Sequence, residues 1–332
     1  MPHGRHNFVY HLSVYYLLSH FIIFEKTDFM QLYNIINPTA NQVPIIISSP
    51  HSGTFFPDHI KSRIKPERTM NPDDTDWFID KLYDFAPALG ITMITANYMR
   101  QYGAKREDFG RICVDQRTNA LGNPNAMFKK ALTLDEYMAA RPISDPIHLF
   151  DCVMPCAGAD AFLVMSEARA RDLGLAHVVV RGAIERHNAF SDDPVMVRGG
   201  WLQDRDDLYA QAGVGPGALD FVQTYDDYPV IVMMQFEDLG FCDKGEGPAF
   251  VQSHTMAFDG SFPNNTSGGQ LSAGQAGAAG GFLGMVEAIR QLTDQAGPRA
   301  VPDAQLGLVA GFGMVTYDRC LCTGAVILGR PE

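Results

Sequence analysis

Strand and helix patterns alternate along most of this chain, and this alternation restricts its fold more than any other feature. Short apolar runs bounded by turn-forming residues predict strands, whereas apolar residues three or four apart predict helices. The predicted strands are 44–49, 91–96, 162–166, 177–181, 219–224, 306–310 and 323–328, and the predicted helices are 74–88, 106–120, 167–174, one from 208, 230–239 and 276–293. Alternation of this kind predicts an α/β fold. Residues 123–146 read as irregular, and residues 182–205 read as a linker between two lobes.

The composition is that of a globular protein that acts on small molecules. The chain has 332 residues, of which 46% are hydrophobic and 19% charged, enough for one or two domains with a sizeable core. A formal net charge of −12 argues against a nucleic-acid partner, because phosphate backbones are bound through excess Lys and Arg. The six cysteines are too scattered for a disulfide framework, so we expect a reducing cytoplasm.

The segment 1–29 contains an apolar run from Phe8 to Phe24, which is about 17 residues long and interrupted by histidines and serines. This length is at the lower limit for a membrane-spanning helix, and no small-residue cleavage site follows. An extension that precedes a natural start at Met30 is the interpretation we favour. A weak membrane anchor and an ordinary buried segment are the alternatives, and a membrane protein is not expected.

The strongest local signal is a glycine-rich loop, Asn264 to Gly277, that leads into the predicted helix 276–293. Glycines let a backbone approach a ligand closely, and amides at the start of a helix attract negative charge. The loop therefore suits a thioester carbonyl or a phosphate, and the alternative is a tight packing contact that requires small residues. The candidate binding residues are Asn265, Ser267, Gly268, Gly269, Ser272 and Gly274.

Two family resemblances meet near residue 97. The motifs PIIISSPHSGTFFPD and NPDDTDWF, within 43–97, resemble the amino-terminal part of the N-formylglutamate amidohydrolases. The motifs GADAFLVMSEARARDLG, DLGFCDKGEGPAF and NTSGGQLSAGQ, within 98–332, resemble the later part of the thiolases, particularly the lipid-transfer and archaeal types. We therefore predict four segments: the extension 1–29, an incomplete α/β amidohydrolase-like fragment 30–97, the end of a thiolase amino-terminal domain 98–204, and a thiolase-like carboxy-terminal domain 205–332.

The thiolase resemblance implies a layered α/β lobe with a mixed sheet, and acyl transfer or Claisen-type condensation on an acyl-CoA thioester. Thiolases usually carry a histidine where this chain has Gln275, and glutamine can donate a hydrogen bond but cannot shuttle a proton. Cys322, in a Cys-x-Gly motif, could serve as the family's proton-transferring cysteine, although GFGM at 311–314 competes for that alignment and a buried small residue is the alternative. The acyl-accepting cysteine would lie in the half that the amidohydrolase-like fragment replaces. The resemblance also implies a homo- or hetero-oligomer.

The amidohydrolase resemblance assigns zinc-binding roles to His51, Asp74 and Asp76. A histidine at a strand end and a nearby carboxylate can hold a zinc ion whose bound water attacks an amide. The family's later elements do not follow, so the matched residues leave the coordination sphere short of ligands. Zinc is therefore an alternative rather than an expected cofactor.

The sequence is compatible with four functions. An acyltransferase-like protein that acts on or binds acyl-CoA is the first, and a zinc-dependent N-formylglutamate amidohydrolase-like hydrolase is the second. The replaced histidine and the missing nucleophile support the third, a non-catalytic thiolase-like subunit. The fourth is a fusion without a selected activity.

Overall fold

The structure is a computed structural model that describes residues 45–46, 86–277, 280–316 and 319–332. The chain divides into two compact units, of which the smaller comprises 1–48 and 161–175. In this smaller unit β1 (Ile45–Ile46) pairs antiparallel with β4 (Phe162–Leu163), and the short helix α7 (Glu167–Asp172) follows. The Ser166 hydroxyl caps α7 by accepting a hydrogen bond from the backbone N–H of Arg169.

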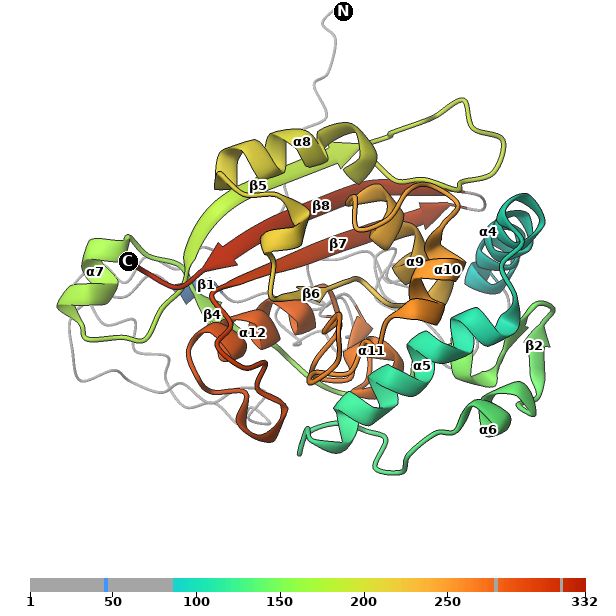
Figure 1. Cartoon of the computed structure of the whole chain (residues 1–332), viewed down its shortest axis with the longest axis horizontal. Coiled ribbons are helices and arrows are strands. Elements are labelled where there is room, and N and C mark those ends of the chain that lie inside the picture. Colours follow the sequence, from blue (N-terminus) through green and yellow to red (C-terminus); the bar gives the residue numbers. More distant parts are fainter. Residues whose placement is uncertain (1–44, 47–85, 278–279, 317–318) are drawn as a thin grey trace, which may run out of the picture. The chain divides into compact units, whose positions relative to one another are not determined.

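The larger unit is built on a mixed four-stranded sheet with the order β5-β8-β7-β6 (Figure 1). Its strands are β5 (Val179–His187), β6 (Phe221–Gln223), β7 (Leu306–Thr316) and β8 (Arg319–Gly329). The β8 strand pairs antiparallel with both β5 and β7, whereas β6 runs parallel to β7. The mixed sheet expected for this half of the chain is confirmed.

Helices pack on the sheet of the larger unit and extend from it (Figure 1). They are α4 (Ala86–Tyr102), α5 (Arg106–Leu121), α6 (Leu134–Met138), α8 (Trp201–Ala212), α9 (Pro229–Asp238), α10 (Gly247–Ser253), α11 (Gly269–Ser272) and α12 (Gly280–Leu292). The 3-10 turns are η1 (Leu149–Asp151), η2 (Pro216–Ala218) and η4 (Gly297–Arg299), and a small hairpin joins β2 (Pro142–Ser144) to β3 (Ile147–His148). Within the described ranges, no helix is both long and apolar enough to cross a membrane.

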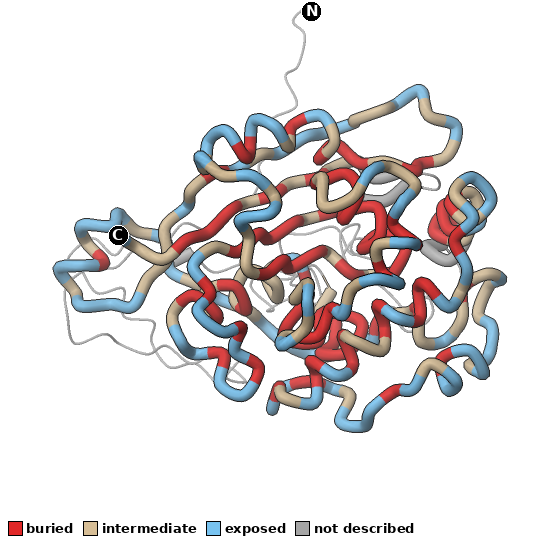
Figure 2. Tube along the Cα trace, viewed as in Figure 1, coloured by how far each residue is buried: buried red, intermediate tan, exposed pale blue. Residues whose placement is uncertain are grey.

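The two faces of the sheet bury different clusters, because successive side chains of a strand point to opposite faces. Leu308 and Phe312 belong to the main core, which also includes residues of α5, α8 and α9. Val309 belongs to a second cluster with Ala288 and Leu292 of α12. Figure 2 shows that both β7 and β8 carry buried stretches along their length. Every residue of α9 is buried, and its two charged residues, Glu237 and Asp238, are paired with Lys244.

The strand predicted at 91–96 is wrong, because these residues lie inside helix α4. Its β-branched residues suggested a strand, but Ile91, Ile94 and Tyr98 are three and four positions apart and are at most 2% exposed. This segment therefore buries one face of a helix. The linker predicted at 182–205 is also wrong at both ends, since β5 continues to His187 and α8 begins at Trp201.

The predicted helices 106–120 and 230–239 are confirmed as α5 and α9. The predicted strands at 306–310 and 323–328 are confirmed within β7 and β8, which are longer because they pair along most of their length. The predicted helix 74–88 falls almost entirely outside the described residues.

A buried ion pair joins α12 to η4. The Arg299 guanidinium donates to both carboxylate oxygens of Glu287 at 2.9 and 2.8 Å, and the two side chains are 5% and 1% exposed. Thr266 Oγ1 and Gln291 Nε2 also donate to Glu287 Oε1. Removing one partner of such a pair leaves an uncompensated buried charge, whereas the intact pair satisfies both.

We predict that Arg299→Leu lowers the free energy of unfolding by about 3–5 kcal/mol, because Glu287 is left buried without its counter-ion. Denaturation with urea measures this loss. Arg330→Leu is the matched control, because its partner Asp294 is 77% exposed, and exposed pairs contribute about 0–1 kcal/mol. Equal losses in the two variants would contradict the assignment.

Candidate functional site

A pocket lies in the larger unit where the glycine-rich loop meets the end of β6 and the first turns of α12. We call it the loop pocket. Its lining includes Thr224, Tyr225, Asn265, Ser267, Gly269 and Gly281. One side of the pocket is the glycine-rich loop itself. The facing sides come from the end of β6, roughly 40 positions earlier in the sequence, and from the start of α12, roughly 15 positions later.

Two glycines of the loop are required by protein contacts. Gly268 has φ 102° and Gly269 has φ 59°, both in the left-handed region that favours glycine. A Cβ on Gly268 would lie 2.5 Å from the Cβ of Ala120 in α5, and one on Gly269 would collide with the Asp226 carboxylate. The tight packing contact, which was the alternative explanation for these glycines, therefore applies to both. Gly281 differs, because no other group lies within 4 Å of its notional Cβ.

Buried side chains hold the backbone of the glycine-rich loop in place through hydrogen bonds. Asn119 Nδ2 in α5 lies within hydrogen-bond distance of the carbonyl oxygens of Met256, Asn264 and Asn265, at 3.2, 2.9 and 3.2 Å. Thr224 Oγ1 donates to Asn264 Oδ1 at 3.1 Å and accepts from Asn265 Nδ2 at 3.1 Å. The loop is therefore held rigidly before any ligand arrives, which lowers the entropic cost of binding.

Asp226 connects the pocket wall to the short helix α11. Its carboxylate oxygens accept hydrogen bonds from the backbone N–H groups of Gln270 and Leu271 at 2.9 and 3.1 Å. Burial raises the pKa of Asp226 to about 8, although the two amides act in the opposite direction. Burial also raises the pKa of the neighbouring Asp227 to about 7.

We predict that Asp226→Asn makes the stability of the protein less dependent on pH. The folded state keeps the Asp226 proton up to about pH 8, whereas an unfolded aspartate loses it near its ordinary value of 3.8. The contribution of Asp226 is therefore full below about pH 4 and is lost as the pH rises towards 8. Urea denaturation at several pH values between 4 and 8 measures the change.

Asp294→Asn is the control for this prediction. Hydrogen bonds from Arg330 lower the pKa of the exposed Asp294, so Asp294 titrates below its ordinary value of 3.8. We expect this substitution to leave the pH dependence between 4 and 8 unchanged. Part of the slope should remain in Asp226→Asn, because the pKa of Asp227 is raised as well. A slope as steep as that of the wild type would contradict the assignment to Asp226.

The structure divides the predicted binding residues into two groups. Asn265, Ser267 and Gly269 line the loop pocket, with Gly268 packed behind them on α5. Ser272 lies elsewhere, and its Oγ accepts a hydrogen bond from Arg117 Nε at 3.0 Å. The first part of the motif therefore forms the pocket, and the second part contributes to packing.

Gly274 and Gln275 belong to the second group. Gly274 has φ 125°, and a Cβ there would lie 2.8 Å from Cys156 Sγ. The backbone of Gln275 donates to the Met154 carbonyl and accepts from the Cys156 N–H, both at 2.9 Å. Gln275 is 7% exposed and is absent from the pocket lining, although its Cγ lies beside Gly280, which is part of that lining. Its catalytic role stays a prediction.

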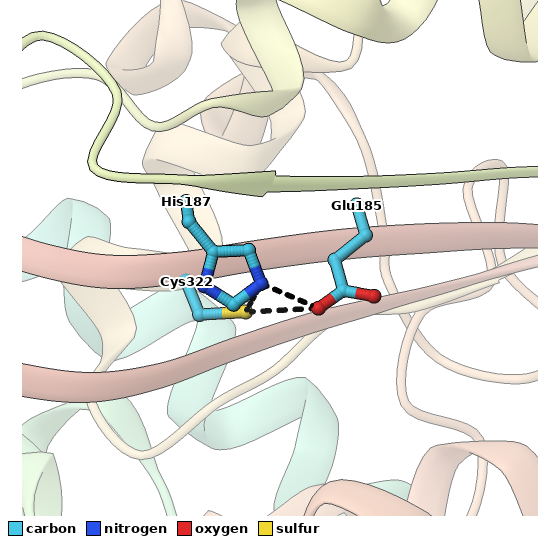
Figure 3. A group of neighbouring side chains, drawn as sticks. All are labelled: Glu185, His187 and Cys322. Atoms are coloured by element: carbon cyan, nitrogen blue, oxygen red, sulfur yellow. Dashed lines mark hydrogen bonds and ion pairs between the residues drawn. The ribbon is translucent and has the colours of Figure 1, made fainter. Parts of the chain in front are cut away.

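Cys322 lies on β8, where the backbone pairs with His187 of β5 and Gly313 of β7. Its Sγ is 3.8 Å from His187 Nε2 and 3.9 Å from Glu185 Oε1 (Figure 3). Burial, and then the Glu185 carboxylate, raise the pKa of the thiol. Cys322 borders a second hollow with Arg186 and Thr323, and this hollow shares no lining residue with the loop pocket. The structure thus does not bring Cys322 into the site of the glycine-rich loop.

The sequence reasoning missed Thr224 and Asp226, which form the wall of the loop pocket, and the pair Glu185 and His187. For Thr224 and Asp226 the signal was their position at the end of the strand predicted at 219–224. For Glu185 and His187 the signal was their spacing of two residues, which places them on one face of a strand. His51, Asp74 and Asp76 lie outside the described residues, and their zinc-binding role stays a prediction.

Comparison with known proteins agrees with this architecture. Residues 182–329 match the family described as Thiolase C-terminal domain-like, and residues 43–103 match N-formylglutamate amidohydrolase. The chain carries a thiolase-like carboxy-terminal domain and an amidohydrolase-like amino-terminal region. Both predicted resemblances and the predicted α/β class of the thiolase-like domain are confirmed.

The curated relatives of this chain include an aldolase, a CoA lyase and an acetyltransferase. A steroid side-chain-cleaving aldolase of Thermomonospora curvata is 34% identical over 74% of this chain and 62% of its own. A 17-hydroxy-3-oxo-4-pregnene-20-carboxyl-CoA lyase of Mycobacterium tuberculosis is 32% identical over 69% of this chain and 62% of its own. An acetyl-CoA acetyltransferase of Methanothermobacter thermautotrophicus is 28% identical over 72% and 63%. The chain thus spans less than two thirds of the length of these relatives.

Two solved structures resemble this thiolase-like fold. The structure named Ltp2-ChsH2(DUF35) aldolase superposes with a TM-score of 0.63 at 30% identity, over 74% of this chain and 64% of that one. A monomeric SCP2-thiolase like protein of Mycobacterium smegmatis superposes with a TM-score of 0.54 at 16% identity, over 74% and 52%, and supports the fold alone.

Proposed function

We propose that the loop pocket binds the thioester end of an acyl-CoA and that the chain serves carbon–carbon bond cleavage rather than acyl transfer. The resemblance to an aldolase and to a CoA lyase supports the reaction class. The composition of the pocket supports it as well, because none of its described lining residues is a cysteine that could accept an acyl group.

The observation that carries this proposal is the Ser267 hydroxyl. Ser267 lines the pocket and is 2% exposed, and its Oγ has no hydrogen-bond partner among the described residues. A buried polar group without a partner costs free energy, so a ligand that supplies one gains affinity. A thioester carbonyl oxygen is such a partner, and it becomes a better one as negative charge develops on it.

The proposed reaction is a retro-aldol cleavage of a 3-hydroxyacyl-CoA. The substrate hydroxyl loses its proton to a base, the bond between Cα and Cβ breaks, and the electron pair moves to the thioester carbonyl. A ketone or aldehyde leaves, and the enolate then takes a proton at Cα. Ser267 would donate to the enolate oxygen, while the glycine-lined first turn of α12 adds the positive end of a helix.

The first prediction from this proposal concerns binding. Gly281→Leu fills the open side of the loop pocket and should weaken binding of acetyl-CoA at least about tenfold, or about 1.4 kcal/mol, in calorimetry. Gly215→Leu is the matched control, because Gly215 is exposed, has an extended backbone and does not line the pocket. Equal binding by the two variants would place the CoA thioester elsewhere.

The second prediction concerns turnover. Cleavage of a 3-hydroxyacyl-CoA should fall about a hundredfold in Ser267→Ala, because one donor to the developing oxyanion is lost, while the exposed Ser253→Ala leaves it unchanged. Thiolysis of acetoacetyl-CoA should not be detected. Thiolysis that disappears in Cys322→Ala would instead support acyl transfer and a catalytic role for that cysteine.

We also propose that the chain works in an assembly. The name of the related structure Ltp2-ChsH2(DUF35) aldolase joins two proteins, which supports a hetero-oligomer. A cytoplasmic location remains the expectation from the cysteine content.

A further inference from the structure

A second cluster of chemically active side chains lies on the sheet, away from the loop pocket. Glu185 and His187 are two residues apart on β5 and therefore share one face of the sheet, and His187 is in register with Cys322 of β8. The three ligand atoms, Oε1, Nε2 and Sγ, lie within 4.8 Å of one another. Figure 3 shows the three side chains turned toward one common point.

Two of the three distances between these atoms are close to those of a tetrahedral zinc site. Bonds of about 2.0–2.1 Å to nitrogen or oxygen and about 2.3 Å to sulfur place the ligand atoms about 3.3–3.6 Å apart. The observed separations are 3.8 Å between Cys322 Sγ and His187 Nε2, 3.9 Å between Cys322 Sγ and Glu185 Oε1, and 2.6 Å between His187 Nε2 and Glu185 Oε1. The two distances to sulfur are slightly longer than in a zinc site, whereas the third is that of a hydrogen bond between imidazole and carboxylate, which a bound ion would replace.

The same geometry argues against a cysteine protease-like relay. In such a relay one ring nitrogen of the histidine faces the nucleophile, while the carboxylate binds the other. Here the single nitrogen Nε2 faces both Cys322 Sγ and Glu185 Oε1. Three side-chain atoms that can each bind a metal therefore face one common point, as they would around a bound cation.

The neighbouring positions on this face are glycines. Across the strands, Glu185 is in register with Gly324 and then Gly311, and Cys322 is in register with Gly313. A Cβ on Gly313 would meet nothing within 4 Å, and one on Gly311 would meet only the Gly324 carbonyl oxygen. Among the described residues, nothing therefore blocks the approach of a fourth ligand from the side of β7.

We propose that Glu185, His187 and Cys322 bind one divalent transition-metal ion, with the fourth position open to water or to a group from another molecule. One thiolate, one imidazole and one carboxylate form a mixed donor set that suits zinc, and a three-ligand set with an open position is typical of catalytic zinc sites. The proposed site shares no residue with the lining of the loop pocket, nor with the predicted zinc ligands His51, Asp74 and Asp76.

Cobalt substitution tests this site in the full-length protein. We expect the metal-free protein to bind one equivalent of Co²⁺ with a thiolate-to-cobalt charge-transfer absorption, and Zn²⁺ to displace it. Cys322→Ser should abolish that absorption. His187→Ala and Glu185→Gln should each weaken Co²⁺ binding at least about tenfold, since even the loss of an outer-shell partner costs 10–100-fold in known sites. Both side chains are more than 60% exposed, so these variants should fold normally.

Two controls separate this site from others. Cys156→Ser removes a free, partly buried cysteine outside the cluster, and His51→Ala removes the histidine of the amidohydrolase-like region. Both should leave the cobalt spectrum and affinity unchanged. A charge-transfer band that persists in Cys322→Ser, or that is lost in Cys156→Ser or His51→Ala, would overturn the proposal, and so would the absence of Co²⁺ binding in the wild-type protein.

Discussion

The buried carboxylate of Glu287 determines where the glycine-rich loop and α12 lie relative to each other. It accepts hydrogen bonds from Thr266 of the loop, Gln291 of α12 and Arg299 of η4, so a single charged group connects three segments. A carboxylate with 1% exposure is stable only when its oxygens are fully hydrogen-bonded. The loop pocket lies between two of the connected segments, and its shape therefore depends on this interaction.

The glycine-rich motif serves two structural purposes that its sequence does not separate. Its first part, from Asn264 to Gly269, is held by Asn119 and Thr224 and forms the pocket. Its second part pairs with the backbone near Met154 and binds Arg117 through Ser272. Glycine and serine are favoured both where a ligand approaches and where two backbones pack closely. Composition alone could not distinguish these purposes. The positions of Ala120 and Asp226 show which glycines are required by packing.

Sequence patterns correctly predicted those elements whose pattern lies within a single segment of the chain. The helices at 106–120 and 230–239 were predicted because their apolar spacing is helical, and the sheet class followed from the alternation of elements. The segment 91–96 was predicted wrongly because β-branched residues favour strands, although the spacing of Ile91 and Ile94 was already helical. The cluster of Glu185, His187 and Cys322 could not be predicted, because it depends on the register between β5 and β8, which are separated by more than a hundred residues.

The contact between Gly268 and Ala120 has a consequence for how this pocket can diverge among related proteins. A larger residue at either position would push the loop away from α5, so both should remain small together in any descendant that keeps the pocket. The opposite wall carries no such restriction, because Gly281 faces open space. Evolution of a new ligand specificity in this pocket is therefore expected to proceed through substitutions at the start of α12, while the loop side stays fixed.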